Sequence, residues 1–220
     1  MKIIKPSYEI LTPISDGGIK ELQHIEKIGR VCYKSEDRIT DDGESAKKFV
    51  KMLISNGHEA MIEHSSLSVK FVVDRGVSHE LVRHRIASFA QESTRYCNYS
   101  KDKFGNEITV ILPCFFDTGM GVLSNSLVYQ EWKLACECAE ERYFNLLKMG
   151  ATPQQARTVL PNSLKTEITI TANYREWRNF FKLRTAEASH PQMREVTIPL
   201  LKELKTLIPI IFDDIEVKNE

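Results

Sequence analysis

The chain has 220 residues, of which 42% are hydrophobic, so it is long enough to close the core of one large α/β domain or two small ones. Thirty basic and thirty acidic residues cancel, whereas chains that bind nucleic acid or membrane surfaces usually carry a marked positive excess. We therefore expect one domain over residues 1–220, and neither a nucleic-acid nor a membrane partner.

The sequence carries no pattern typical of a targeting segment or a disulfide framework. The stretch MKIIKPSYEIL has no cleavable hydrophobic core, and no window approaches the roughly 18 consecutive apolar residues of a membrane helix. We therefore expect a cytoplasmic protein. The five cysteines form no C-x-x-C pair, which predicts reduced thiols rather than disulfides or a zinc ribbon.

The N-terminal part of the chain predicts one strand and two helices. Residues 2–12 contain β-branched and aromatic side chains and predict an opening strand. Apolar residues at helical spacing predict a helix over residues 18–31 and a second over residues 44–55. The pair Asn56-Gly57 predicts the end of the second helix.

The segment HEAMIEH, residues 58–64, resembles a metal-binding pattern but has the wrong spacing. An H-E-x-x-H motif would need a histidine at Ile62, and the H-x-x-E-H variant would need one at Ala60. No metal is therefore expected, and His58 and His64 are assigned a structural or ligand-orienting role. Alternating apolar residues over 67–73 then predict a strand.

Residues 83–96, RHRIASFAQESTRY, are the basic motif of this chain. Residues 71–82 predict the end of the preceding strand and a short helix, so Arg83, His84 and Arg85 would lie at the C-terminal end of that helix, where cations are favoured. Guanidinium, hydroxyl and amide groups together suit a phosphorylated small molecule. Each arginine taken alone is more typical of a solvated helix end than of a ligand site.

The C-terminal half predicts two strands and several helices. Residues 108–113 predict a short strand, and residues 124–148 a long helix with a stripe of Val128, Trp132, Ala135, Ala139, Tyr143 and Leu146. Such a stripe is more often core or subunit contact than a cofactor site. Residues 153–161 place Arg157 in a short helix between prolines.

A strand over residues 164–171 and a charged helix follow. On that helix Arg175, Asn179 and Lys182 share one face, while Arg184 lies at the far end. A solvated face would explain these charges equally well. A last helix over residues 191–207 has Pro199 inside it or at a break.

The basic motif resembles the signature of the flavin-dependent thymidylate synthases: Arg-His-Arg, seven residues, Ser93 and then Arg95-Tyr96. The resemblance extends from about His58 to Arg184 and includes the Ala-Arg-x-x-Leu-Pro setting of Arg157. The order of elements is compatible with it. The expected fold class is α+β, a single domain with a central, mostly antiparallel sheet flanked by helices, one of them long.

The resemblance implies conversion of dUMP to dTMP, with methylenetetrahydrofolate as carbon donor and FAD relaying hydride from NADPH. It also implies a homotetramer with sites shared between subunits. The residues that it assigns to dUMP are Glu80, Leu81, Val82, Arg83, Gln91, Glu92, Ser93, Thr94, Arg95, Arg157 and Arg184. Those that it assigns to FAD are His58, Ala60, Glu63, Arg83, His84, Arg85, Gln91, Asn173, Tyr174, Arg175 and Asn179.

Two departures from the family pattern concern these assignments. Ala60 and Met61 stand where relatives commonly have Thr and Pro, so Ala60 offers only backbone contacts to a flavin. Ala90 and Gln91 stand where many relatives have Asn and Glu, so Gln91 can hydrogen-bond but brings no charge. No G-x-G-x-x-G follows a strand, so a Rossmann cofactor domain is not expected.

The resemblance implies Arg184 as the catalytic residue, and the chemistry suits a guanidinium in that role. Methylation at C5 of uracil requires either a thiolate added at C6 or stabilisation of negative charge on the N3, C2 and O2 side of the ring. A guanidinium can provide the second by charge-assisted hydrogen bonds, and the resemblance gives that role to Arg184.

Two other functions remain open from the residues alone. The first is a synthase with Cys114 as nucleophile, although its apolar surroundings, ILPCFF, would raise a buried thiol's pKa. All five cysteines, Cys32, Cys97, Cys114, Cys136 and Cys138, instead look structural. The second is a nucleotide- or RNA-binding module that uses the arginines and Tyr96, for which a basic domain would be expected.

Overall fold

The computed structural model describes residues 1–119 and 121–217. The described chain has an α+β fold with a four-stranded antiparallel sheet, a separate two-stranded sheet and one long helix, so the predicted fold class is confirmed. Within the described residues, no helix is both long and apolar enough to cross a membrane.

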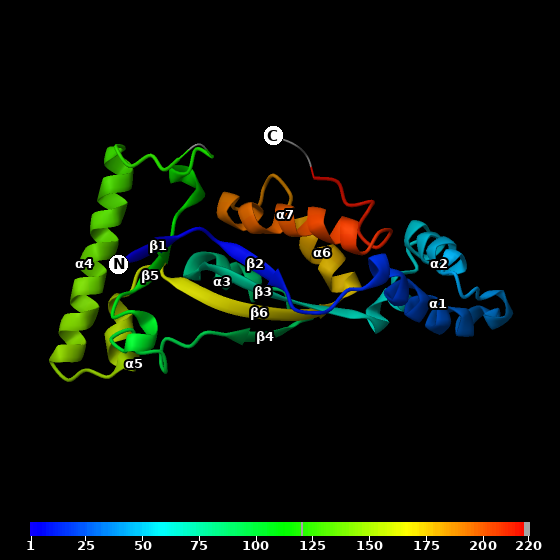
Figure 1. Cartoon of the computed structure of the whole chain (residues 1–220), viewed down its shortest axis with the longest axis horizontal. Coiled ribbons are helices and arrows are strands. Elements are labelled where there is room, and N and C mark those ends of the chain that lie inside the picture. Colours follow the sequence, from blue (N-terminus) through cyan, green and yellow to red (C-terminus); the bar gives the residue numbers. More distant parts are fainter. Residues whose placement is uncertain (120, 218–220) are drawn as a thin grey trace. The chain divides into compact units, whose positions relative to one another are not determined.

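The elements follow one another along the chain as shown in Figure 1. The strands are β1 (Lys2–Ile4), β2 (Ser7–Ile10), β3 (Ser66–Asp74), β4 (Ser88–Gln91), β5 (Thr109–Ile111) and β6 (Lys165–Asn173). The helices are α1 (Ile19–Tyr33), α2 (Glu44–Ser55), α3 (Arg75–Leu81), α4 (Leu127–Lys148), α5 (Pro153–Ala156), α6 (Tyr174–Arg184) and α7 (Pro191–Leu207). Short 3₁₀ helices are η1 (Asp16–Gly18), η2 (Glu36–Arg38), η3 (Glu59–His64), η4 (Asp102–Phe104), η5 (Cys114–Phe116) and η6 (Arg157–Val159).

The four-stranded sheet has the order β2-β3-β6-β4, with its two nine-residue strands in the middle. Both long strands alternate buried and partly exposed residues, as predicted for strands with one face in the core. The opening segment differs from the prediction, because it forms two strands and not one. Pro6 separates them, since proline has no N–H for a ladder hydrogen bond, and β1 pairs in parallel with β5 instead.

Contacts within the chain group it into two compact units. Unit 1 comprises Met1–Ser7, Phe71–Arg83 and Ala90–Thr169. Unit 2 comprises Tyr8–Lys70, His84–Phe89 and the residues from Ile170 onward. Since the chain enters and leaves each unit more than once, no single position in the sequence separates them.

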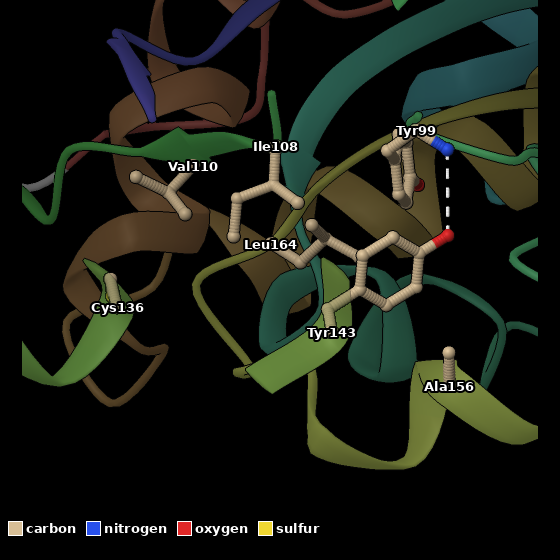
Figure 2. Packing of buried hydrophobic residues seen from close by; sticks show 7 residues of the cluster. All are labelled: Tyr99, Ile108, Val110, Cys136, Tyr143, Ala156 and Leu164. Carbon is tan, nitrogen blue, oxygen red and sulfur yellow. Dashed lines mark hydrogen bonds between the residues drawn. The ribbon is translucent and has the colours of Figure 1, made fainter. Parts of the chain in front are cut away.

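The core of unit 1 contains a cluster of seven buried residues, drawn in Figure 2: Tyr99, Ile108, Val110, Cys136, Tyr143, Ala156 and Leu164. The backbone N–H of Tyr99 donates to the Tyr143 hydroxyl at 3.4 Å, as the dashed line marks. The side of α4 that is buried agrees only in part with the predicted stripe. Tyr143 is buried as predicted, but Cys136 is buried while the predicted Ala135 is exposed, and the predicted Val128 is 68% exposed. Apolar residues occur on both sides of α4, so periodicity did not identify the buried side.

The core of unit 2 is organised around the aromatic side of α6. Trp177 stacks on Phe181, with ring centroids 5.7 Å apart, and its indole N–H donates to the Leu67 carbonyl at 2.9 Å. Phe180 packs edge-on against Trp177 at 5.0 Å. In the same unit α1 contacts α2, and α6 contacts α7 (Figure 1). One side of α6 is thereby fixed in the core, and its polar side is held in a defined orientation.

Arg178 is a buried charge on α6, with a side chain only 2% exposed. It donates to both carboxylate oxygens of Asp214, at 2.5 and 2.7 Å, and to the Ile211 carbonyl. Its Nε also donates to Glu59 at 3.1 Å. Burial opposes the charge, but the two carboxylates raise the pKa of Arg178, and the guanidinium lowers the pKa of Asp214. The residue thus ties η3 and the chain near Asp214 to α6.

Candidate active site

A cavity of about 500 Å³ lies along the polar side of α6 in unit 2, and we call it the α6 pocket. Its lining residues come from η3, from the basic motif, from the end of β6 and from α6: Glu59, Glu63, Ile86, Asn173, Arg175, Glu176, Asn179 and Lys182. The prediction that Arg175, Asn179 and Lys182 share one face is confirmed, because all three line this cavity. Its volume is typical of small-molecule sites.

The start of α6 positions the first of these side chains. Strand β6 runs directly into the helix, and the Asn173 side chain accepts from the backbone N–H of Glu176 at 2.9 Å. Such an N-cap satisfies one of the unpaired donors of the first turn and stabilises a helix by about 1 kcal/mol. The positive end of the helix dipole therefore lies at the pocket, where it favours an anionic group.

The α6 pocket contains ion pairs as well as cations and amides. Arg175 donates to Glu63 at 2.5 Å, and this carboxylate raises the pKa of the exposed guanidinium. Lys182 lies 4.0 Å from Glu59. The predicted groups, Arg175 and Asn179, are thus accompanied by three carboxylates, of which Glu59 and Glu176 were not expected from the sequence. Their chemistry lets the pocket accept hydrogen bonds as well as donate them.

His84 connects the basic motif to α6. Its buried ring places Nδ1 at 3.0 Å from Glu176 Oε1, and Arg184 Nε donates to its Nε2 at 3.0 Å. Phe180 packs against the ring, with centroids 4.8 Å apart. Burial lowers the pKa of His84, the hydrogen bond to Glu176 raises it, and the charge of Arg184 lowers it, with a net decrease. This decrease favours the neutral imidazole, and because Nε2 accepts from Arg184, the proton of that form lies on Nδ1.

Unit 1 brings together several residues assigned to the nucleotide. Arg157 donates to the Thr94 hydroxyl at 3.3 Å, Arg95 Nε donates to Gln154 at 3.1 Å, and the Ser93 hydroxyl accepts from the Arg95 backbone N–H. Arg95 and Arg157 are exposed, so their guanidinium groups face solvent. This part of unit 1 can offer charged and hydroxyl donors to a phosphate.

Glu92 and Gln91 lie in unit 1 with their side chains bonded inside it. Glu92 accepts from the Tyr99 hydroxyl at 3.2 Å and from Lys165 at 3.0 Å, and it lines a second cavity of about 350 Å³. Burial raises the pKa of Tyr99, and the carboxylates of Glu167 and Glu92 raise the pKa of Lys165 against the effect of burial. The Gln91 amide donates to Ser78 and Thr166.

The other assigned residues are scattered. In unit 2, Glu63 and Asn173 line the α6 pocket, Ala60 and Arg85 are exposed, and His58 Nδ1 lies 3.2 Å from the Tyr33 hydroxyl. Tyr174 is fully buried, and its ring packs edge-on against Phe212 at 6.0 Å, so its side chain faces the core. In unit 1, Glu80 is half-buried, Leu81 is buried, and Val82 and Arg83 are exposed beyond the end of α3.

No metal-binding group is found among residues 1–119 and 121–217, because no three His, Cys, Asp or Glu side chains lie close enough together to hold an ion. The thiols are dispersed. Cys32 and Cys138 are exposed, Cys97 and Cys114 are half-buried, and burial raises the pKa of Cys136.

Comparisons with known proteins agree with one another. Residues 19–210 match the family described as thymidylate synthase complementing protein. The flavin-dependent thymidylate synthase of Corynebacterium aurimucosum is 32% identical over 214 residues, covering 93% of this chain and 84% of that protein. Those of Corynebacterium efficiens and Mycobacterium avium are 31% and 30% identical, covering 89% and 88% of this chain and 80% and 79% of theirs.

A solved structure has a similar fold. It is the UMP/dUMP methylase PolB from Streptomyces cacaoi, bound with 5-Br dUMP, and it superposes with a TM-score of 0.78 at 23% identity. The match covers 97% of this chain and 96% of that one.

Proposed function

Since this chain belongs to the flavin-dependent thymidylate synthase family, we propose that it methylates dUMP to dTMP, with methylenetetrahydrofolate as carbon donor, NADPH as reductant and FAD as cofactor. The observation that supports this most is the state of Arg184, the residue matched to the family's uracil-contacting arginine. Its Nε donates to a buried histidine of the basic motif, His84.

The α6 pocket fits a flavin dinucleotide in its chemistry. Arg175, Asn173 and Asn179 would hold the cofactor, because they combine a cation, two amides and the N-terminal end of α6 in one cavity. An anionic group must compete with Glu63 for Arg175, since these two side chains are paired. When bound, FAD supplies the hydride that reduces the transferred carbon.

On the substrate side we propose that Arg95, Arg157 and Ser93 bind the phosphate of dUMP. Their guanidinium and hydroxyl groups suit bidentate recognition of phosphate oxygens. Arg184 would face the N3, C2 and O2 edge of uracil and stabilise the negative charge that makes C5 nucleophilic. An arginine stays protonated under these conditions, so its role is to hold charge and not to take a proton.

We expect the purified protein to be yellow, or to quench the fluorescence of added FAD. Arg175→Ala should weaken FAD binding by roughly 10- to 100-fold, because a charge-assisted hydrogen bond is lost. Arg38→Ala is the matched control, since this arginine is exposed and lies in η2, outside the α6 pocket. A colourless protein that does not quench FAD fluorescence would contradict the proposal.

A second prediction separates this chemistry from a thiolate mechanism. We expect a variant with all five cysteines replaced by Ser or Ala to retain FAD- and NADPH-dependent dTMP formation, with some loss of stability from buried Cys136. The measurement is dTMP formed from dUMP, resolved by chromatography. Loss of dTMP formation in Cys114→Ala, in a protein that still folds and binds FAD and dUMP, would favour the thiolate.

We also propose a homotetramer, as the family resemblance implies. Helix α4 supports a subunit contact, since Leu127 and Leu134 are 81% and 58% exposed. Light scattering should give a mass about four times that of the 25.3-kDa chain, and activity should fall on dilution to monomer. An active monomer would refute this assembly.

A further inference from the structure

We propose that Glu176 is a positioning residue of this enzyme, which holds Arg184 in place through the imidazole of His84. The inference rests on the proposed function, in which Arg184 meets the pyrimidine ring. It concerns a residue that does not itself touch the substrate, and it assigns a function to the carboxylate that the family motif does not include.

The geometry forms an unbroken chain of hydrogen bonds. Glu176 Oε1 lies 3.0 Å from His84 Nδ1, and His84 Nε2 lies 3.0 Å from Arg184 Nε. The side chains of Glu176 and His84 are only 8% and 5% exposed, so water cannot easily replace either partner. Glu176 and Arg184 both belong to α6 and lie eight positions apart. The buried ring of His84 connects them across about two turns of the helix.

The directions of these bonds depend on the carboxylate. A neutral imidazole has one donor and one acceptor nitrogen, and the hydrogen bond at one nitrogen sets the state of the other. A carboxylate accepts only, so Glu176 keeps the proton on Nδ1 and leaves the lone pair of Nε2 for Arg184. The aspartate of Ser-His-Asp hydrolases orients its histidine in the same way. With the proton on Nε2, the ring and the guanidinium would present donors to each other.

Fixing Nε has a consequence for the reaction. The guanidinium group is planar, and the hydrogen bond at Nε restricts its rotation. This bond therefore fixes the orientation in which the guanidinium contacts the edge of a pyrimidine ring. Misplacement of a catalytic group by about 1 Å can cost 10²-fold in rate. Glu176 therefore acts on turnover through the orientation of Arg184.

Glu176 also joins this chain to the α6 pocket. Asn179, which lines the pocket, donates to both carboxylate oxygens of Glu176 at 3.3 Å. The carboxylate is thus held from the pocket side by an amide and from the other side by the imidazole. A ligand that engages Asn179 changes a bond to the same carboxylate that orients His84.

The tautomer of His84 tests the proposal without any turnover. Nitrogen chemical shifts of ¹⁵N-histidine-labelled protein distinguish protonated from unprotonated ring nitrogens, and His84→Gln identifies the signals among the six histidines. We expect the Nδ1–H form in the wild type and its loss in Glu176→Gln, whose amide can donate to Nδ1. An Nε2–H form in the wild type would overturn the proposal even if every variant failed to fold.

Kinetics test the positioning role itself. At saturating FAD, Glu176→Gln should lower kcat about 10²-fold, with the KM for dUMP within about threefold. Glu44→Gln on α2 is the matched control, since its side chain is 56% exposed, and it should alter neither kcat nor the His84 signals. An unchanged kcat in Glu176→Gln would overturn the proposal.

The pH dependence of kcat distinguishes a positioning role of Glu176 from a purely structural one, which would leave this dependence unchanged. The charged groups that act on His84 are Glu176 and Arg184, both from α6. As the pH falls through the lowered pKa of His84, Nε2 gains a proton, Arg184 loses this acceptor, and kcat falls. In Glu176→Gln this acid limb should be absent, because Nε2 already carries the proton at neutral pH. An acid limb in Glu176→Gln like that of the wild type would count against the proposal.

The proposed function and the positioning role of Glu176 can be refuted by different results. A wild type that binds FAD but forms no dTMP would overturn the proposed function, while the histidine spectra would still decide whether Glu176 sets the state of His84.

Discussion

Replacing Arg184 with alanine is expected to lower kcat for dTMP formation by at least 10²-fold while the flavin stays bound. Removing one preorganised donor to a developing negative charge typically costs about 10²–10³ in kcat. Arg184 is not among the residues that line the α6 pocket, so FAD absorbance and FAD affinity should change little. Single-turnover measurement of dTMP, together with flavin absorbance, separates the two effects.

Two further variants make this result specific. Arg184→Lys keeps the charge but lacks the planar fork and the Nε that donates to His84, so it should restore only a small part of the activity. Arg38→Ala removes an exposed arginine from η2 and should leave kcat unchanged. If kcat of Arg184→Ala stays within about tenfold of wild type, which is roughly 1.4 kcal/mol, the catalytic assignment is wrong.

Replacing Arg178 with methionine is expected to lower the free energy of unfolding by about 3 kcal/mol, because it leaves Glu59 and Asp214 without their buried partner. Since Asp214 is about half exposed, we expect the low end of the range for broken buried pairs. Urea denaturation measures the change, and Tm should fall by roughly 6–12 °C in a chain of this size. Arg38→Met in η2 controls for the loss of an exposed arginine.

The sign of the pH effect follows from Asp214. Its pKa is lowered in the folded state, mainly by the hydrogen bond from Arg178, so the pair stabilises the fold at neutral pH. This contribution is lost as the pH falls below the ordinary aspartate range and through the lowered pKa. The difference in the free energy of unfolding between wild type and Arg178→Met should therefore become smaller at acidic pH. A difference below about 1 kcal/mol at pH 7 would show that the pair is not stabilising.

The elements with strong local patterns were predictable from sequence. Alternation predicted β3 and β6, and helical spacing with Asn56-Gly57 gave the bounds of α2. Strand β4 was not predicted, because its four residues lie inside the basic motif and carry no alternating apolar pattern. Pairing between distant segments, such as β1 with β5, depends on tertiary contacts that short-range periodicity does not contain.

The candidate site was predictable in its residue types but not in its contacts. The shared face of Arg175 and Asn179 followed from helix geometry, and Glu176 could have been found in the same way, three positions before Asn179. The burial of Arg178 and Tyr174 could not be predicted, since an isolated helix gives no measure of which of its polar residues face the core. Nor could the sequence predict that His84 accepts from Arg184, because the two lie 100 positions apart.

The long central strands pass directly into helices, with no intervening loop: β3 into α3 at Asp74, and β6 into α6 at Asn173. Length variation is therefore far less tolerable at these junctions than in the stretch before α4. One residue inserted between Asn173 and Tyr174 would turn the rest of α6 by about 100° and advance it by about 1.5 Å. Asn179 and Arg184 would then rotate away together, and Trp177 would leave the core. Homologous chains that keep this chemistry should accumulate insertions and deletions elsewhere.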